Sequence, residues 1–240
     1  AVAQTISAGG TGDALVLAGT AFNNTAGSTA LSAPSGRWIV YSTTPASNTF
    51  GGLVSGNNAV WGATFTGNAP STIAAGKRYV FSAAPTASAA ASNATSTYDG
   101  TSTFTGLTYT TSGLVNAATY GNVFLQDAFT GAVAVSSPGK NVGTYTIGVG
   151  TLAAPAGYQF NSANDFTPGT ATITAATLTV GGVAAANKVY DAGMSATLTG
   201  TPTVTPFGGD SVSVSGTGTA SFANKNVGTG KAVTVSGYGL

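Results

Sequence analysis

The hydrophobic residues of the chain lie in short runs that alternate with Ser or Thr and are separated by Gly-rich turns. Such runs occupy residues 15–17, 38–41, 79–81, 145–147, 178–180, 211–215 and 232–235. A period of two places one set of side chains in a core and the other in water. The β-branched residues Val and Thr favour the pleated sheet. No window carries a sustained 3.6-residue apolar stripe, so the pattern predicts an all-β protein.

The N-terminal region, residues 1–85, contains both Trp residues and has apolar groups at short, irregular intervals. Small polar residues lie between these groups. Two interpretations stay open at this point. The region is either the end of a β-solenoid, in which short strands stack with Gly and Asn at the corners, or an independent small β domain. The Ala-rich stretch 83–94, which contains Pro85, is typical of a linker or an extended crossover.

A two-part motif occurs twice in the rest of the chain. A Tyr-Asp pair is followed in each copy by Lys-Asn-Val-Gly-Thr. The motif residues are Tyr98, Asp99, Gly100, Lys140, Asn141 and Gly143 in the first copy, and Tyr190, Asp191, Lys225, Asn226 and Gly228 in the second. The copies are separated by about the length of an Ig-sized sandwich domain. We therefore expect tandem Ig-like, β-sandwich-type modules at residues 86–176 and 177–240, after the N-terminal β region.

The motif residues are of types that build turns. Asp and Asn side chains bond the local backbone, and Gly takes positive φ. Tyr98 and Tyr190 precede their turns, where a ring is buried and its hydroxyl stays at the rim. If the turns meet at one end of a module, Lys140 pairs with Asp99 and Lys225 pairs with Asp191. A surface pair of this kind contributes about 0–1 kcal/mol.

Composition excludes most catalytic chemistry. The chain has 0 Cys and 0 His, and its six acidic residues are all Asp and widely separated. No Ser-His or Cys-His pair and no usual zinc site can form, so we expect no enzyme and no cofactor. Calcium is the one metal that we consider, because oxygen ligands suit it. Asp99 and Asp191 are the candidate ligands, although both also fit simple turn roles.

Charge and hydropathy limit the partners. The net charge is +1 and the seven basic residues are scattered, which disfavours nucleic acid. No apolar run approaches the ~20 residues of a spanning helix, so we expect no membrane insertion. Trp38, Tyr41 and Trp61 offer aromatic faces on which a glycan stacks. The alternative is that they pack in the core, because residues 38–41 alternate along a strand.

Longer matches around the motifs resemble known families. Val189-Tyr190-Asp191 with residues 220–233 is similar to the YDG-type repeat of large bacterial exoproteins. Tyr98-Asp99-Gly100 with residues 143–145 resembles the related MBG-type repeat. Residues 36–42 and 48–53 resemble the region that follows the β-helix in filamentous-haemagglutinin-like adhesins of the two-partner secretion pathway.

The resemblance implies a secreted or cell-surface protein of a Gram-negative bacterium, with an upstream β-helix and a stalk of β modules. It also implies that the module at residues 177–240 is incomplete, so that its open edge is covered by later residues or by a neighbouring chain. Three hypotheses follow. The chain is a stalk or spacer of an adhesin, a region that binds a glycan or protein receptor, or a subunit that assembles with copies of itself into an extracellular fibre by strand exchange.

Overall fold

The computed structural model describes residues 4–101 and 103–240, and the prediction of an all-β protein is confirmed. Strands make up 37% of the chain and helix 4%. Contacts group the described residues into two compact units. Unit 1 comprises residues up to 94, 105–137 and 146–171, and unit 2 comprises residues 95–104, 138–145 and 172–240. The predicted domain limits at residues 85 and 176 stay predictions.

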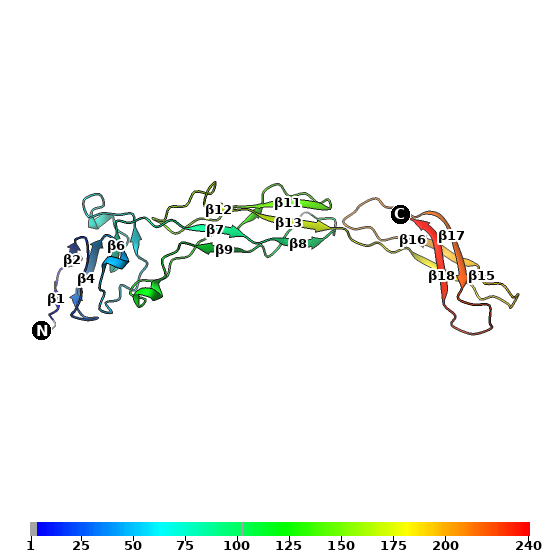
Figure 1. Cartoon of the computed structure of the whole chain (residues 1–240), viewed down its shortest axis with the longest axis horizontal. Helices are drawn as coiled ribbons and strands as arrows, with labels where there is room; N and C mark the ends of the chain where they lie inside the picture. The colour runs from blue at the N-terminus through cyan, green and yellow to red at the C-terminus, as the bar shows by residue number, and fades with distance from the viewer. Residues whose placement is uncertain (1–3, 102) are drawn as a thin grey trace. The chain divides into compact units, whose positions relative to one another are not determined.

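The N-terminal part of unit 1 is a stack of parallel strands, which we call the coil stack. Its elements are β1 (Ile6–Ser7), β2 (Gly12–Ala18), β3 (Leu31–Ser32), β4 (Gly36–Ser42), β5 (Val60–Trp61) and β6 (Arg78–Phe81), with the 3-10 helices η1 (Pro45–Ser47) and η2 (Pro70–Thr72). Every strand pair in it is parallel, and β2, β4, β6 and β5 lie side by side in that order (Figure 1).

Successive coils of the stack match the solenoid interpretation. Ile6 pairs with Leu31, Leu15 pairs with Trp38, and Asn23 forms a bridge to Thr49. Parallel strands joined by a return segment of similar length in each coil are the repeating unit of a solenoid. Gly, Asn and Ser at the corners give the turns that such coils need.

Both faces of the coil stack are covered, which explains the near-continuous apolar run in β4. Trp38 and Val40 enter one hydrophobic cluster, and Ile39 and Tyr41 enter another. All four side chains are buried. A parallel sheet buried on both faces reads as an unbroken hydrophobic segment because neither set of alternating side chains meets water.

One cluster is closed by residues far along the chain, from a segment that we call the aromatic cap (residues 113–127). The cap contains η3 (Ala117–Tyr120) and the buried Phe124. The Phe124 ring lies 6.0 Å from that of Phe81 and 6.2 Å from those of Phe50 and Trp61. Edge-to-face pairs of this kind each add about 0.5–1.5 kcal/mol beyond burial.

The cap also covers the free edge of the parallel sheet. Ser55 N–H donates to the Val123 carbonyl over 2.8 Å, and Leu125 N–H donates to the Asn57 carbonyl over 3.0 Å. Residues 123–125 thereby run beside residues 55–58, next to β5. These bonds give the outermost residues of the sheet the backbone partners that an edge otherwise lacks.

A buried carboxylate joins the cap to the coil stack. Asp127 accepts hydrogen bonds from Trp61 Nε1 and Asn58 Nδ2, each over 2.8 Å, and from the Tyr158 hydroxyl over 3.2 Å. Burial, reinforced by the charge of Asp127, raises the pKa of Tyr158 to about 12. The phenol therefore stays protonated as a donor at neutral pH. Three donors from separate segments thus converge on one acceptor.

Residues 88–174 form two further sheets. Their elements are β7 (Ser88–Ala91), β8 (Ala94–Thr97), β9 (Tyr109–Ser112), β10 (Ala134–Val135), β11 (Gly143–Gly148), β12 (Phe166–Thr167) and β13 (Gly169–Thr174). One sheet has the order β10-β11-β13-β8 and the other has the order β12-β7-β9. Along β13, Gly169, Ala171 and Ile173 are buried while Thr170 and Thr174 are exposed, as the period of two predicts.

The C-terminal part of unit 2 carries two small antiparallel sheets. They are β14 (Gly181–Ala185) with β16 (Leu198–Thr203), and β15 (Ser195–Ala196), β17 (Ser215–Phe222) and β18 (Val233–Gly239) in the order β15-β17-β18. Among the described residues of unit 2, Ile173 of β13 is the only buried side chain, and no residue after it is buried. Val and Thr still alternate here, but no core is closed.

We predict that Asp127→Ala lowers the free energy of unfolding of the coil stack by about 1–3 kcal/mol, because it leaves the buried indole N–H of Trp61 without its hydrogen-bond acceptor. Denaturant titration followed by Trp fluorescence measures the change. Asp127→Asn, which keeps the shape and one acceptor oxygen, is the matched control and should lose less. A stability of the Ala variant within about 0.5 kcal/mol of the wild type would contradict this role.

Candidate binding site at the repeat motif

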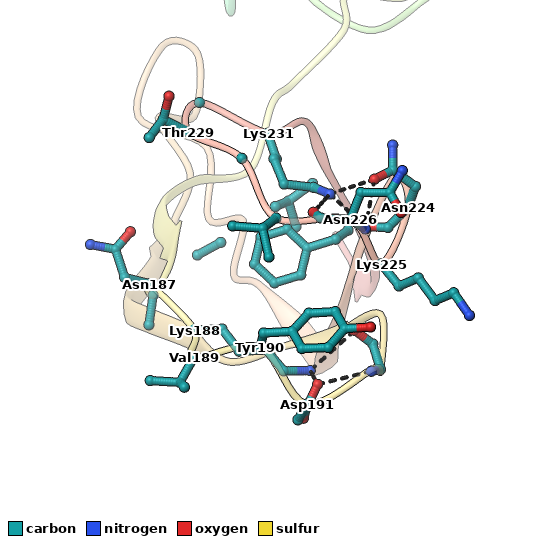
Figure 2. A pocket seen from close by; sticks show the side chains of 18 residues that line it. Asn187, Lys188, Val189, Tyr190, Asp191, Asn224, Lys225, Asn226, Thr229 and Lys231 are labelled. Carbon is teal, nitrogen blue, oxygen red and sulfur yellow. Dashed lines mark hydrogen bonds and ion pairs between the residues drawn. The ribbon is translucent and has the colours of Figure 1, made fainter.

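The two halves of the second motif copy meet around one hollow, which we call the motif hollow. It has a volume of about 490 Å³ and is lined by residues 185–191, Gly193, Phe222, residues 224–231 and Val233. The Tyr-Asp half comes from the loop after β14, and the Lys-Asn-Val-Gly-Thr half comes from the loop between β17 and β18. Figure 2 shows the two loops on opposite sides of one space, with the Lys225, Val189 and Thr229 side chains pointing away from it.

The Tyr-Asp loop is held by its aspartate. Asp191 Oδ1 accepts the Gly193 N–H over 2.9 Å and pairs with Lys188 Nζ over 2.8 Å. The hydrogen bond from Lys188, followed by that from the Gly193 backbone, lowers the pKa of Asp191. Ala192 between them has φ 63°, in the region that L side chains rarely adopt. The carboxylate thus stabilises a tight and strained turn.

The first motif copy builds the same local turn. Asp99 Oδ1 accepts the Thr101 N–H and the Thr101 hydroxyl, each over 2.8 Å. These bonds lower the pKa of Asp99, the hydroxyl bond most. In both copies the aspartate therefore caps the backbone N–H two residues later, which is the turn role that the sequence predicts.

The second loop is organised by a lysine outside the shared motif. Lys231 Nζ donates to the carbonyls of Asn224, over 2.7 Å, and Asn226. Figure 2 shows this ammonium between the two asparagines. Asn224 Oδ1 also accepts the Asn226 N–H over 3.1 Å. One cation therefore gathers the carbonyls of a loop that has no strand partner of its own.

The rim of the motif hollow exposes large apolar side chains. Val189 is 88% exposed, Val227 is 85% exposed and Tyr190 is 59% exposed. Single exposed apolar residues are ordinary, but several around one hollow mark a surface that is suited to a partner. The hollow is therefore the candidate site of the protein.

The aromatic residues considered for glycan stacking lie elsewhere. Trp38 is 0% exposed, and Tyr41 and Trp61 are each 4% exposed. The Tyr41 hydroxyl donates to the Asn68 carbonyl over 2.9 Å, and the Trp61 indole N–H is used by Asp127. A sugar ring cannot reach these faces, so the glycan-contact interpretation does not fit their burial, and the core-packing alternative does.

The expected pairing of motif lysines with motif aspartates is wrong. Lys140 Nζ pairs with Asp210 over 3.1 Å instead of with Asp99, and Asp191 pairs with its near neighbour Lys188 instead of with Lys225. Sequence spacing suggested that the turns of one module meet. In the structure, the partner of Asp191 lies three residues earlier in the chain, and the partner of Lys140 lies on a loop 70 residues later.

Asp210 also connects to the first motif through Tyr98. The Tyr98 hydroxyl donates to Asp210 Oδ2, and the Tyr98 ring lies 6.3 Å from that of Phe207 at an edge-to-face angle. The bond from Tyr98, followed by that from Lys140, lowers the pKa of Asp210. Gly100 lies against this loop with φ +81°, and a Cβ there would come within 2.5 Å of the Gly208 Cα. Only Gly fits at that position.

The remaining motif residues have local roles or stay exposed. The Tyr145 hydroxyl donates to the Asn141 carbonyl over 2.6 Å, which closes the loop before β11. Lys225 and Asn226 line the motif hollow.

Within residues 4–101 and 103–240, no three acidic or other metal-ligating side chains gather at one place. In the same described ranges, no helix has the length and apolar character needed to cross a membrane.

The protein is therefore an all-β chain that combines the parallel coil stack with β sheets that carry two copies of the motif. Residues 174–240 match the family model described as "YDG domain". The match covers the C-terminal part of the chain, including both halves of the second motif copy and the motif hollow. No curated protein and no solved structure matches the chain.

Sequence reasoning missed the residues that shape the motif hollow. Lys188 and Lys231 lie just outside the shared motif, and the sequence analysis gave no role to Val189 or Val227. A usable signal was present for the valines. Val189 directly precedes Tyr-Asp and Val227 lies inside Lys-Asn-Val-Gly-Thr, where alternation with polar residues breaks down.

We predict that Asp210→Asn removes stability at neutral pH but not in strong acid. The pKa of Asp210 is lowered in the folded state, so its contribution is present above its unfolded pKa of about 3.9 and is lost as pH falls through the folded pKa. Thermal melts of both proteins from about pH 7 to about pH 2 should therefore converge at the acid end.

Tyr98→Phe is the matched control, because it removes only the hydroxyl that contributes most to the lowered pKa. It should shift the melt in the same direction as Asp210→Asn. A constant difference between wild type and Asp210→Asn at every pH would show that the Asp210 charge is not coupled to folding.

Proposed function

We propose that the chain is a structural spacer segment of a bacterial cell-surface adhesin, in which it supports attachment made by other parts of the protein. The observation that carries this proposal is the succession of a capped parallel coil stack and β sheets that bear two copies of one turn motif. The match of residues 174–240 to the YDG domain supports it further, because the residues of the second motif copy fall within the match.

The chemistry of the described residues favours support over recognition of a small ligand. The aromatic residues that would contact a sugar are core residues, and the aspartates of the motif hold turns. The coil stack buries both faces of its parallel sheet and closes its edge with the aromatic cap. Such packing gives a rigid base on which further β modules are mounted.

Localisation at the surface of a Gram-negative bacterium belongs to the same proposal. Its support is the resemblance of residues 36–42 and 48–53 to the region after the β-helix of secreted adhesins, together with the parallel coil stack in which residues 36–42 lie. A secreted chain without Cys relies on packing instead of disulfides. The buried cluster around Trp38, Tyr79 and Phe81 supplies that packing in unit 1.

We predict that the purified chain binds no glycan saturably on arrays or by calorimetry, and that beads coated with it do not adhere to host cells. Pulling the chain by its two ends should give a weak unfolding event from unit 2 and a stronger one from unit 1, because all buried side chains of the described residues except Ile173 lie in unit 1. Saturable glycan binding that survives in Trp38→Phe would contradict a spacer role.

A further inference from the structure

The first motif copy contacts the second copy through the loop between β16 and β17, residues 204–214, which we call the docking loop. Asp210 of this loop pairs through Oδ1 with Lys140 Nζ over 3.1 Å, and its Oδ2 accepts the Tyr98 hydroxyl. Tyr98 belongs to the Tyr-Asp half of the first copy, and Lys140 begins the Lys-Asn-Val-Gly-Thr half. All three residues belong to unit 2. The two halves of the first motif therefore meet at one carboxylate from the second copy.

The hydrogen bonds between the two copies all involve this carboxylate. Among the described residues, each hydrogen bond that joins residues 86–176 to residues 177–240 has Asp210 as its acceptor. No sheet contains described strands from both ranges. The covalent link between β13 and β14, residues 175–180, forms no strand and has no buried side chain. Because an unpacked segment keeps its backbone rotations free, this link alone does not hold the two copies at one angle.

Two glycines bring the backbones together at the same contact. A Cβ on Gly100 would come within 2.5 Å of the Gly208 Cα, and a Cβ on Gly208 would come within 2.6 Å of the Gly100 Cα. Each position therefore excludes every side chain because of the other. The Phe207 ring, next to Gly208, also lies edge-to-face with the Tyr98 ring. The contact thus combines matched shape with matched charge, and it is more than an isolated surface ion pair.

The second motif copy shows that Gly100 serves this contact and not the turn itself. Ala192 follows Asp191 just as Gly100 follows Asp99, and Ala192 also has a positive φ, 63°. Both turns are closed by the aspartate, which accepts the N–H two residues later. The turn therefore accepts a Cβ after the aspartate, whereas the approach of the docking loop does not.

We propose that the first motif copy is a docking socket for the docking loop, and that this contact holds the second copy at a fixed orientation to the first. The socket consists of Tyr98, Gly100 and Lys140, and residues 207–210 fill it. Two donors converge on the place of one carboxylate, so the socket fits an acidic loop that has glycine at the closest approach. The inference concerns the joint between the copies and stands whether or not the chain is a spacer of an adhesin.

The test measures the joint in the full chain with pairs of spin labels. Because the chain has 0 Cys, cysteines introduced at the exposed Thr144 of the first copy and Thr234 of the second are labelled specifically. Double electron–electron resonance should give one narrow distance distribution in the otherwise wild-type chain. In Gly208→Ala the distribution should widen at least about twofold, because only residues 175–180 still limit the motion.

Gly209→Ala is the matched control in the same loop. Gly209 also has a positive φ, +81°, but a Cβ there would meet nothing within 4 Å. The control therefore carries the backbone strain of an alanine without the collision, and its distribution should stay narrow. Gly100→Ala, on the other side of the contact, should widen the distribution as Gly208→Ala does.

A second label pair shows whether the second copy stays folded. Labels at Thr201 and Thr234, which are both exposed and both lie in the second copy, should give the same distribution in every variant. Three results for the first label pair would overturn the proposal. These are a wide distribution without any alanine substitution, a narrow distribution in Gly208→Ala, or equal widening in Gly209→Ala and Gly208→Ala.

Discussion

Every β-strand at the edge of a sheet presents backbone groups that need a partner, and this requirement organises the described structure. In unit 1 the outermost residues of the parallel sheet meet residues 123–125, and the aromatic cap closes the cluster beneath them. Asp127 then fixes the cap by accepting from Trp61, Asn58 and Tyr158. The coil stack therefore depends on a segment that lies well beyond it in the sequence. Gly157 lies outside the cap and allows the segment that carries Tyr158 to approach Trp61 closely, because with φ +82° a Cβ there would meet the Trp61 carbonyl at 2.5 Å.

The two motif copies share one local turn and differ elsewhere. In both copies the aspartate of Tyr-Asp accepts the backbone N–H two residues later, so that turn is preserved. The Lys-Asn-Val-Gly-Thr half leads directly into β11 in the first copy, but residues 225–229 of the second copy form no strand. β13 joins β8 to β11 in the first copy, and residues such as Ile147 and Ala171 become buried. In the second copy Val189 is 88% exposed and Val227 is 85% exposed, and none of residues 177–240 is buried.

Strands and turns were largely predictable from the sequence, but contacts between residues far apart in the chain were not. Alternation of Val with Ser or Thr identified the strands at residues 145–147 and 232–235, and Asp99 and Asp191 were predicted as turn residues. Residues 178–180 were expected as a strand, but β14 begins only at Gly181. Residues 211–215 were expected as a strand, but β17 begins only at Ser215. The ion pairs of Lys140 and Asp191 were predicted wrongly, because spacing does not say which loops meet. The aromatic cap was missed for the same reason: nothing in residues 113–127 alone indicates that Phe124 packs on Trp61. The motif hollow was not predictable from the sequence, because it forms where residues 185–191 meet residues 224–231, about 35 positions apart.

The account predicts that edge closure sets local stability, and hydrogen exchange resolved along the chain tests this directly. Amides of β4 and β6, which lie in a sheet buried on both faces, should exchange only when unit 1 unfolds globally. Amides of residues 186–189 and the outward amides of Val233 and Val235 should exchange rapidly, while the inward amides of β18 exchange at an intermediate rate. Protection of residues 186–189 as strong as that of β6, in the isolated chain, would contradict the account.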